Sequence, residues 1–220
     1  MTTALQLRTS CPQNTAQLDY ILLDGSGSMS HQWWDVLASL DAYTSTLRAA
    51  NINSHLILSV FDTEDMDSIQ RDETLDTLVP FSTRPAGMHG GRTPLYDAIN
   101  LLGRRLRELD PQRCSVVIAT DGDENASRYT DATQAKAILD WMRAKGWQIT
   151  FIGCDFNNSR LAERLGAKPE QCIGVSKKLL TDAGKTLGEK RARHALYGTP
   201  MHFTDAEKQQ FGGLLPPPGA

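Results

Sequence analysis

Short apolar runs alternate with helix-like segments along most of this chain, and this alternation restricts the possible fold more than any other feature. Residues 20–23 (Tyr-Ile-Leu-Leu) and 115–119 (Ser-Val-Val-Ile-Ala) are typical of buried strands. Further strands are expected at residues 53–61, 147–153 and 171–175. Strands that alternate with helices favour a doubly wound, mostly parallel sheet. We therefore predict an α/β fold with helices on both faces and one antiparallel edge strand, at residues 67–81.

Helical segments fill the gaps between these strands. They are expected at residues 31–50, 93–109, 131–145, 159–166 and 177–196. The segment that opens with Thr93 has an apolar stripe at helical spacing, formed by Leu95, Ile99, Leu102, Leu106 and Leu109. Pro94 suits the first position of this helix, because a proline there loses no helical hydrogen bond.

A chain of 220 residues with this pattern is expected to form one domain with an extension at each end. The predicted domain covers residues 18–196, after an N-terminal extension of residues 1–17. Residues 197–220 are punctuated by Gly and Pro and contain Pro216-Pro217-Pro218. We expect this C-terminal tail to be extended or disordered.

Composition bears on the compartment and the partner. The first 17 residues lack the apolar run of a signal peptide, and no segment is long and apolar enough to span a bilayer. The four cysteines are scattered without a CxxC pair, which favours buried thiols in a reducing compartment. We therefore predict a cytoplasmic protein. A net charge of −3 gives no overall attraction to nucleic acid or to a membrane.

Side chains with oxygen atoms follow the strand-like runs. Asp24, Ser26 and Ser28 alternate with glycines after the first run, Asp121 follows the run at 115–119, and Thr93 follows Gly90-Gly91. The carboxyl ends of neighbouring parallel strands converge on one crevice, so these distant residues are expected to meet. Two carboxylates and three hydroxyls suit a hard cation, and Mg²⁺ best. We predict a metal site formed by Asp24, Ser26, Ser28, Thr93 and Asp121.

The three pieces together resemble the metal-ion-dependent adhesion site (MIDAS) of von Willebrand factor type A (vWA) domains. That site is written DxSxS, then a threonine, then an aspartate, and all five positions here carry the expected residue type. The resemblance covers roughly residues 18–195. The segment Thr-Pro-Leu-Tyr-Asp-Ala from Thr93 onward resembles the corresponding segment of intracellular bacterial or phage members of the family.

The resemblance implies a metal-dependent protein-binding module and not an enzyme. In the ligand-ready state of the family, the serine and threonine oxygens bind the metal directly and the aspartates act largely through waters. The vacant position of Mg²⁺, or of Mn²⁺ or Ca²⁺ in its place, then favours an Asp or Glu carboxylate from a protein partner. The resemblance also implies that the last helix moves when Thr93 enters or leaves the shell of the metal.

Several other motifs are excluded because a residue that each of them requires is absent. Ser26 stands where a haloacid-dehalogenase phosphatase needs a second aspartate, and Ser30 where a dinucleotide fingerprint needs its third glycine. No lysine completes a P-loop. Ala126 and Ala132 stand at the sixth and twelfth positions of an EF-hand-like start at Asp121. A metal-dependent phosphoryl or phosphodiester enzyme and a phage or mobile-element assembly component remain as alternatives, and the oligomeric state is left open.

Residues around the predicted site permit both structural and functional readings. His31 and His89 are expected at its rim, and one of Trp33 and Trp34 in the core with the other exposed. Asp62, after the second strand, either supports the site or only ends the strand. The cationic residues of the last helix are expected on a solvated face; they are Lys177, Lys178, Lys185, Lys190, Arg191 and Arg193.

Overall fold

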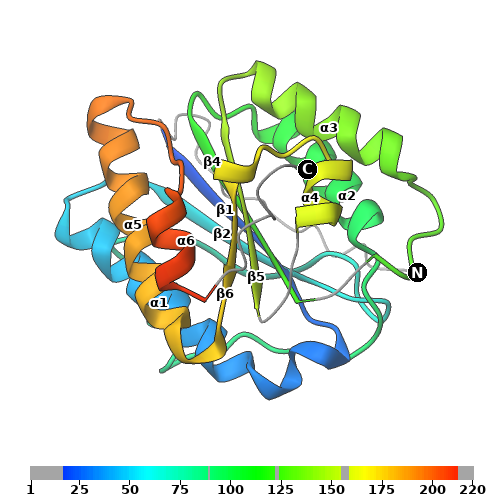
Figure 1. The fold of residues 1–220 in the computed structure, drawn as a ribbon, viewed down its shortest axis with the longest axis horizontal. Coiled ribbons are helices and arrows are strands. Elements are labelled where there is room, and N and C mark those ends of the chain that lie inside the picture. The colour runs from blue at the N-terminus through cyan, green and yellow to red at the C-terminus, as the bar shows by residue number, and fades with distance from the viewer. Residues whose placement is uncertain (1–16, 89, 122–123, 155–158, 213–220) are drawn as a thin grey trace, which may run out of the picture.

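A central six-stranded sheet lies between two layers of helices (Figure 1). The computed structural model describes residues 17–88, 90–121, 124–154 and 159–212. The strand order is β3-β2-β1-β4-β5-β6, and only the β2–β3 pair is antiparallel. The predicted fold class, a mostly parallel sheet with one antiparallel edge strand, is therefore confirmed. The strands are β1 (Leu18–Asp24), β2 (His55–Phe61), β3 (Ser68–Thr74), β4 (Cys114–Thr120), β5 (Gln148–Cys154) and β6 (Cys172–Val175).

Each face of the sheet has its own helices. On one face lie α1 (Trp33–Ala49), α5 (Leu180–Tyr197) and α6 (Asp205–Gln210), at the left of Figure 1. On the other lie α2 (Leu95–Leu109), α3 (Ala132–Ala144) and α4 (Ser159–Arg164). The described residues also form the short 3₁₀ turns η1 (Gly27–His31), η2 (Pro169–Gln171) and η3 (Lys177–Leu179). No helix among the described residues is long and apolar enough to cross a bilayer.

The strands β1, β2 and β4 are buried along their whole length because both of their faces are covered, whereas the edge strand β3 is mostly polar and only partly buried. In β1, Ile21 and Leu23 belong to the core under α1 and α5, whereas Tyr20 and Leu22 belong to the core under α2 and α3. All seven residues of β1 are buried. This two-sided burial explains why the sequence shows uninterrupted apolar runs and no alternation.

The register of the central strands brings two carboxylates to one edge. Asp24, the last residue of β1, lies opposite Phe61 of β2, and Leu23 lies opposite Ala119 of β4. Asp121 directly follows the last residue of β4, which is the neighbour of β1 in the sheet. Asp121 and Asp24 therefore lie at the same edge. The carboxyl edge of the sheet therefore gathers residues that are almost a hundred positions apart.

The helix α5 packs closely on α1. A Cβ added to Gly184 would lie 2.2 Å from the backbone oxygen of Ser39, and one added to Gly188 would lie 2.9 Å from that of Tyr43. Only glycine permits this approach without a shift of one helix. α1 and α5 are therefore held at a short separation.

Arg191 of α5 is buried, contrary to the expectation that the cationic residues of the last helix are solvated. It is 1% exposed, and its Nε donates to Asp19 Oδ1 of β1 at 2.7 Å. The Asp19 carboxylate also accepts hydrogen bonds from Tyr43 Oη at 2.6 Å and Ser54 Oγ at 2.5 Å. A buried ion pair thus attaches α5 to β1.

The segment after Tyr197 also differs from the expected extended or disordered tail. Over residues 198–212 it folds back, and Met201, Phe203 and Phe211 are buried in the core beside α1 and α5. Thr204 caps α6 with a complete capping box. The sequence of this segment contains glycine, proline and polar residues but no apolar run. The burial of these three apolar side chains was therefore not evident from the sequence. The three consecutive prolines lie outside the described residues.

Candidate metal site

Four of the five predicted ligands form a hydrogen-bonded chain at the carboxyl edge of the sheet. The Ser26 backbone N–H donates to Asp24 Oδ1 at 2.8 Å, and the hydroxyls of Ser26 and Ser28 lie 3.1 Å apart. Ser28 Oγ donates to Asp121 Oδ1 at 2.7 Å. Residues from the ends of β1 and β4 therefore converge at one place, as the sequence predicted.

Thr93, the fifth predicted ligand, is brought to this place by backbone contacts between glycines. Gly27 N–H donates to Gly91 O at 2.9 Å, and Gly90 N–H donates to Gly25 O at 3.0 Å. A Cβ on Gly27 would lie 3.0 Å from Gly90 O, so a side chain there would press on the facing loop. Thr93 itself is 1% exposed, two residues beyond Gly91. The two loops thus form one rigid edge.

Two further residues orient the carboxylates, and sequence reasoning missed both. Gln32 Nε2 donates to Asp121 Oδ2 at 2.8 Å, and Thr120 Oγ1 donates to Asp24 Oδ2 at 2.6 Å. Each aspartate therefore has both oxygens engaged by neighbours. In the sequence, only the position of Gln32 soon after the serine loop hinted at a role. Thr120 directly precedes Asp121, yet its hydroxyl donates to Asp24.

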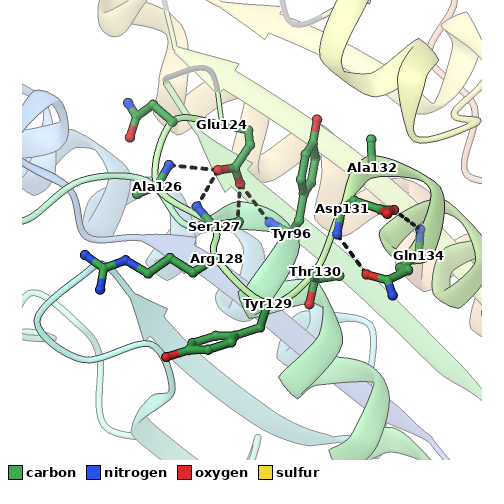
Figure 2. A pocket seen from close by; sticks show the side chains of 11 residues that line it. Tyr96, Glu124, Ala126, Ser127, Arg128, Tyr129, Thr130, Asp131, Ala132 and Gln134 are labelled. Carbon is green, nitrogen blue, oxygen red and sulfur yellow. Dashed lines mark hydrogen bonds between the residues drawn. The ribbon is translucent and has the colours of Figure 1, made fainter.

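The loop after β4 is fixed to the start of α2. Glu124 accepts hydrogen bonds from the backbone N–H groups of Ala126, Ser127 and Tyr96, at 2.7–2.9 Å (Figure 2). Asn125 Oδ1 accepts from Thr93 N–H at 3.1 Å, and Asn125 N–H donates to Thr93 O at 3.2 Å. The Glu124 carboxylate therefore serves to order the loop itself.

The charges of the site favour a cation. Burial raises the pKa of Asp24, and the nearby Asp121 carboxylate adds to the rise, although hydrogen bonds from Thr120 and Ser26 lower it. Two carboxylates held close together, one of them the fully buried Asp24, repel each other unless a positive charge joins them. Since the remaining donors are hydroxyls, the residues fit a hard, oxygen-preferring ion such as Mg²⁺.

Histidine and cysteine play no part in this donor set. Within the described residues, no group of three or more His, Cys, Asp or Glu side chains is placed to hold a metal. A site of the zinc type is therefore not among the described residues, and any cation at this edge would rely on the hydroxyl oxygens.

The two tryptophans at the rim of the site differ in burial, as the sequence predicted. Trp33 is buried, with its Nε1 donating to Ala86 O at 3.1 Å, whereas Trp34 is 65% exposed. His31 is exposed, and His89 lies outside the described residues. Asp62 is buried, and its Oδ1 accepts from Glu64 N–H at 2.7 Å, so it shapes the turn after β2.

Comparisons with known proteins find relatives by structure alone. No protein-family model and no curated protein sequence matches the chain. The pilus adhesin SpaC from Lactobacillus rhamnosus GG superposes with a TM-score of 0.62 at 10% identity, over 82% of this chain and 31% of that one. The manganese-loaded TRAP protein of Plasmodium vivax gives 0.53 at 18% identity, over 77% and 72%.

A third solved structure is described as von Willebrand factor type A, from Catenulispora acidiphila. It gives a TM-score of 0.58 at 11% identity, over 81% of this chain and 43% of that one. The chain thus spans less than half the length of SpaC and of the Catenulispora protein. Such likenesses concern the fold and not the activity. With its strand order and its helices on both faces, the chain has the von Willebrand factor type A fold.

Proposed function

We propose that the chain is a divalent-metal-dependent protein-binding module that takes up an Asp or Glu carboxylate of a partner through Mg²⁺. The observation that carries the proposal is the connected cluster of Asp24, Ser26, Ser28 and Asp121 at the carboxyl edge. The names of two structural neighbours support it, since SpaC is an adhesin and the TRAP structure holds manganese.

The residues divide the work between charge, donor atoms and orientation. Asp24 and Asp121 supply the negative charge, and Ser26, Ser28 and Thr93 supply neutral oxygens. When bound, the ion supplies a positive centre for an incoming carboxylate. Gln32 and Thr120 hold the two aspartates in one orientation (2.8 and 2.6 Å). Because the hydroxyl donors add no charge, the site keeps an attraction for an anionic ligand.

We propose binding and not catalysis at this site. In the part of the chain that the structure describes, no histidine, cysteine or lysine side chain is hydrogen-bonded to Asp24 or Asp121. Such side chains commonly serve as the base or the nucleophile of a hydrolytic reaction. We propose a reducing, cytoplasmic location as well, supported by the free thiols of Cys114 and Cys172.

Calorimetric titration with Mg²⁺, Mn²⁺ and Ca²⁺ tests the metal site. The wild type should bind at least one of these ions, and Ser26→Ala combined with Asp121→Ala should abolish binding. Ser30→Ala is the matched control, because Ser30 is an exposed serine of the same loop. Saturating metal should also raise the melting temperature, since a ligand at about 100 times its Kd adds about 2.7 kcal/mol. Absence of binding by the wild type would contradict the proposal.

Protein capture from a lysate of the source cells tests the partner. We expect a protein that is retained by the wild type in Mg²⁺, released by EDTA, and not retained by the Ser26→Ala, Asp121→Ala variant. Metal binding without any such partner would favour the alternative of a phosphoryl or phosphodiester enzyme. A screen of phosphate-ester and phosphodiester substrates with and without Mg²⁺ would detect that activity.

A further inference from the structure

A hollow of about 690 Å³ lies directly beside the candidate metal site. Residues 90–92 form one of its walls and residues 125–128 another, with Thr63 and Glu64 also in the lining. Both walls are tied to the predicted ligands, because Gly91 O accepts from the loop of Ser26 and Ser28, and Asn125 pairs with the backbone of Thr93. A peptide that reaches the metal can therefore extend into this hollow.

Two arginines of these walls form no ion pair with any carboxylate that the structure describes. The side chains of Arg92 and Arg128 are exposed, and among the described residues no carboxylate forms an ion pair with either. Other arginines of the chain are paired, as Arg105 is with Asp67 and Arg191 with Asp19. No described carboxylate therefore competes with an external anion for the two guanidinium groups.

The backbone beneath both arginines is fixed. Arg92 N–H donates to Thr63 Oγ1 at 2.9 Å, and Arg128 N–H donates to Asp97 Oδ2 at 2.7 Å. Figure 2 shows the Arg128 side chain extending away from the Glu124 carboxylate that orders the loop. Binding an anion would therefore order two side chains and leave the loops in place, which lowers the entropic cost of binding.

The charge of the hollow selects an acidic partner. Arg92 and Arg128 contribute two positive charges against one negative charge from Glu64, so the lining carries a net charge of +1 in a chain whose total is −3. We propose that the partner presents an acidic segment with two carboxylates, one for the metal and a second one for Arg92 and Arg128. This inference rests on the proposed function and names the chemistry of its partner. Guanidinium groups suit a carboxylate because they donate in a planar fork.

The test uses peptides in which a second carboxylate is present or absent. The diacid series is acetyl-Glu-(Gly)n-Glu-amide with one to four glycines, so that the spacing is sampled at about 3.3–3.6 Å per residue. The monoacid series has glutamine in place of the last glutamate. Affinities are measured by NMR titration of the wild type, of Arg92→Gln with Arg128→Gln, and of Arg104→Gln. Arg104 is an exposed arginine further along α2 and serves as the matched control.

At the best spacing, the diacid should bind the wild type in Mg²⁺ about three- to tenfold more tightly than the monoacid, as expected for exposed ion pairs. Arg92→Gln with Arg128→Gln should abolish this gain and leave the monoacid affinity unchanged. Arg104→Gln should keep the gain, and higher salt should reduce it.

The outcomes separate this inference from the proposed function. Metal-dependent binding of the monoacid, with no gain from the second glutamate or a gain that survives the arginine substitutions, overturns the inference alone. An arginine-dependent gain that persists in EDTA overturns the metal route but supports the acidic segment. No binding of either series in Mg²⁺ overturns both.

Discussion

Replacing Asp19 by asparagine should destabilise the protein more than any surface substitution. The Asp19 carboxylate accepts from Tyr43 Oη at 2.6 Å, from Ser54 Oγ at 2.5 Å, and from Arg191 Nε at 2.7 Å and Nη2 at 3.2 Å. Asparagine keeps the shape but removes the charge. Burial lowers the pKa of Arg191, yet Asp19 and Tyr43 outweigh it and the pKa is raised overall. Without Asp19, a buried cation remains unopposed.

The expected loss is about 3–5 kcal/mol, the usual cost of removing one partner of a buried ion pair. This is a large part of the total of about 5–15 kcal/mol for a domain. Urea unfolding followed by far-UV circular dichroism measures it as a fall in the midpoint at unchanged slope. Asp19→Leu combined with Arg191→Met should recover most of the loss, because no charge is then left buried.

A loss below about 1 kcal/mol for Asp19→Asn would refute this reasoning, because such a value is typical of an exposed pair. Metal titration of the same variant provides a second check. Asp19 lies five residues before Asp24 on β1, about 16 Å at the rise of a strand. Metal affinity should therefore stay at the wild-type value.

Three further predictions concern other parts of the molecule. Gln32→Leu should weaken Mg²⁺ binding about 10- to 100-fold in calorimetry, because it frees Asp121 Oδ2; unchanged affinity would exclude an orienting role. Gly184→Ala should cost about 1–3 kcal/mol and lower the melting temperature, since its Cβ would lie 2.2 Å from the Ser39 oxygen; an unchanged temperature would contradict the close packing of α1 and α5. Burial raises the pKa of Cys172 to about 12, so its thiol stays protonated at pH 8. Iodoacetamide should label it at least about tenfold more slowly than a free cysteine, as measured by peptide mass mapping, and equal rates would refute the shift.

The sequence predicted the order of strands and helices because β1, β2 and β4 are buried on both faces and leave apolar runs. It also predicted the convergence of Asp24 and Asp121, since parallel neighbouring strands end at the same edge. Both inferences depend on local pattern plus one rule of topology. They needed no knowledge of individual side-chain contacts.

Contacts between distant residues were not accessible in this way. Gln32 is a single amide without a motif, and its role depends on where Asp121 lies, 89 positions away. Arg191 stands in a cationic run, and only the position of Asp19, 172 positions away, explains its burial. Phe203 stands in the short stretch Thr199-Pro200-Met201-His202-Phe203-Thr204, which forms no helix or strand, so its place in the core follows from the fold and not from local pattern.

The glycine-to-glycine contacts between the loops at residues 25–27 and 90–91 bear on how such a protein diversifies. They use backbone atoms only, so the geometry of the edge does not depend on which side chains surround it. Exposed neighbours such as Trp34 and Tyr129, 65% and 75% exposed, can be exchanged without disturbing that edge. Substitution of such exposed side chains can therefore change the surface that a partner meets while the four glycines keep the central geometry constant.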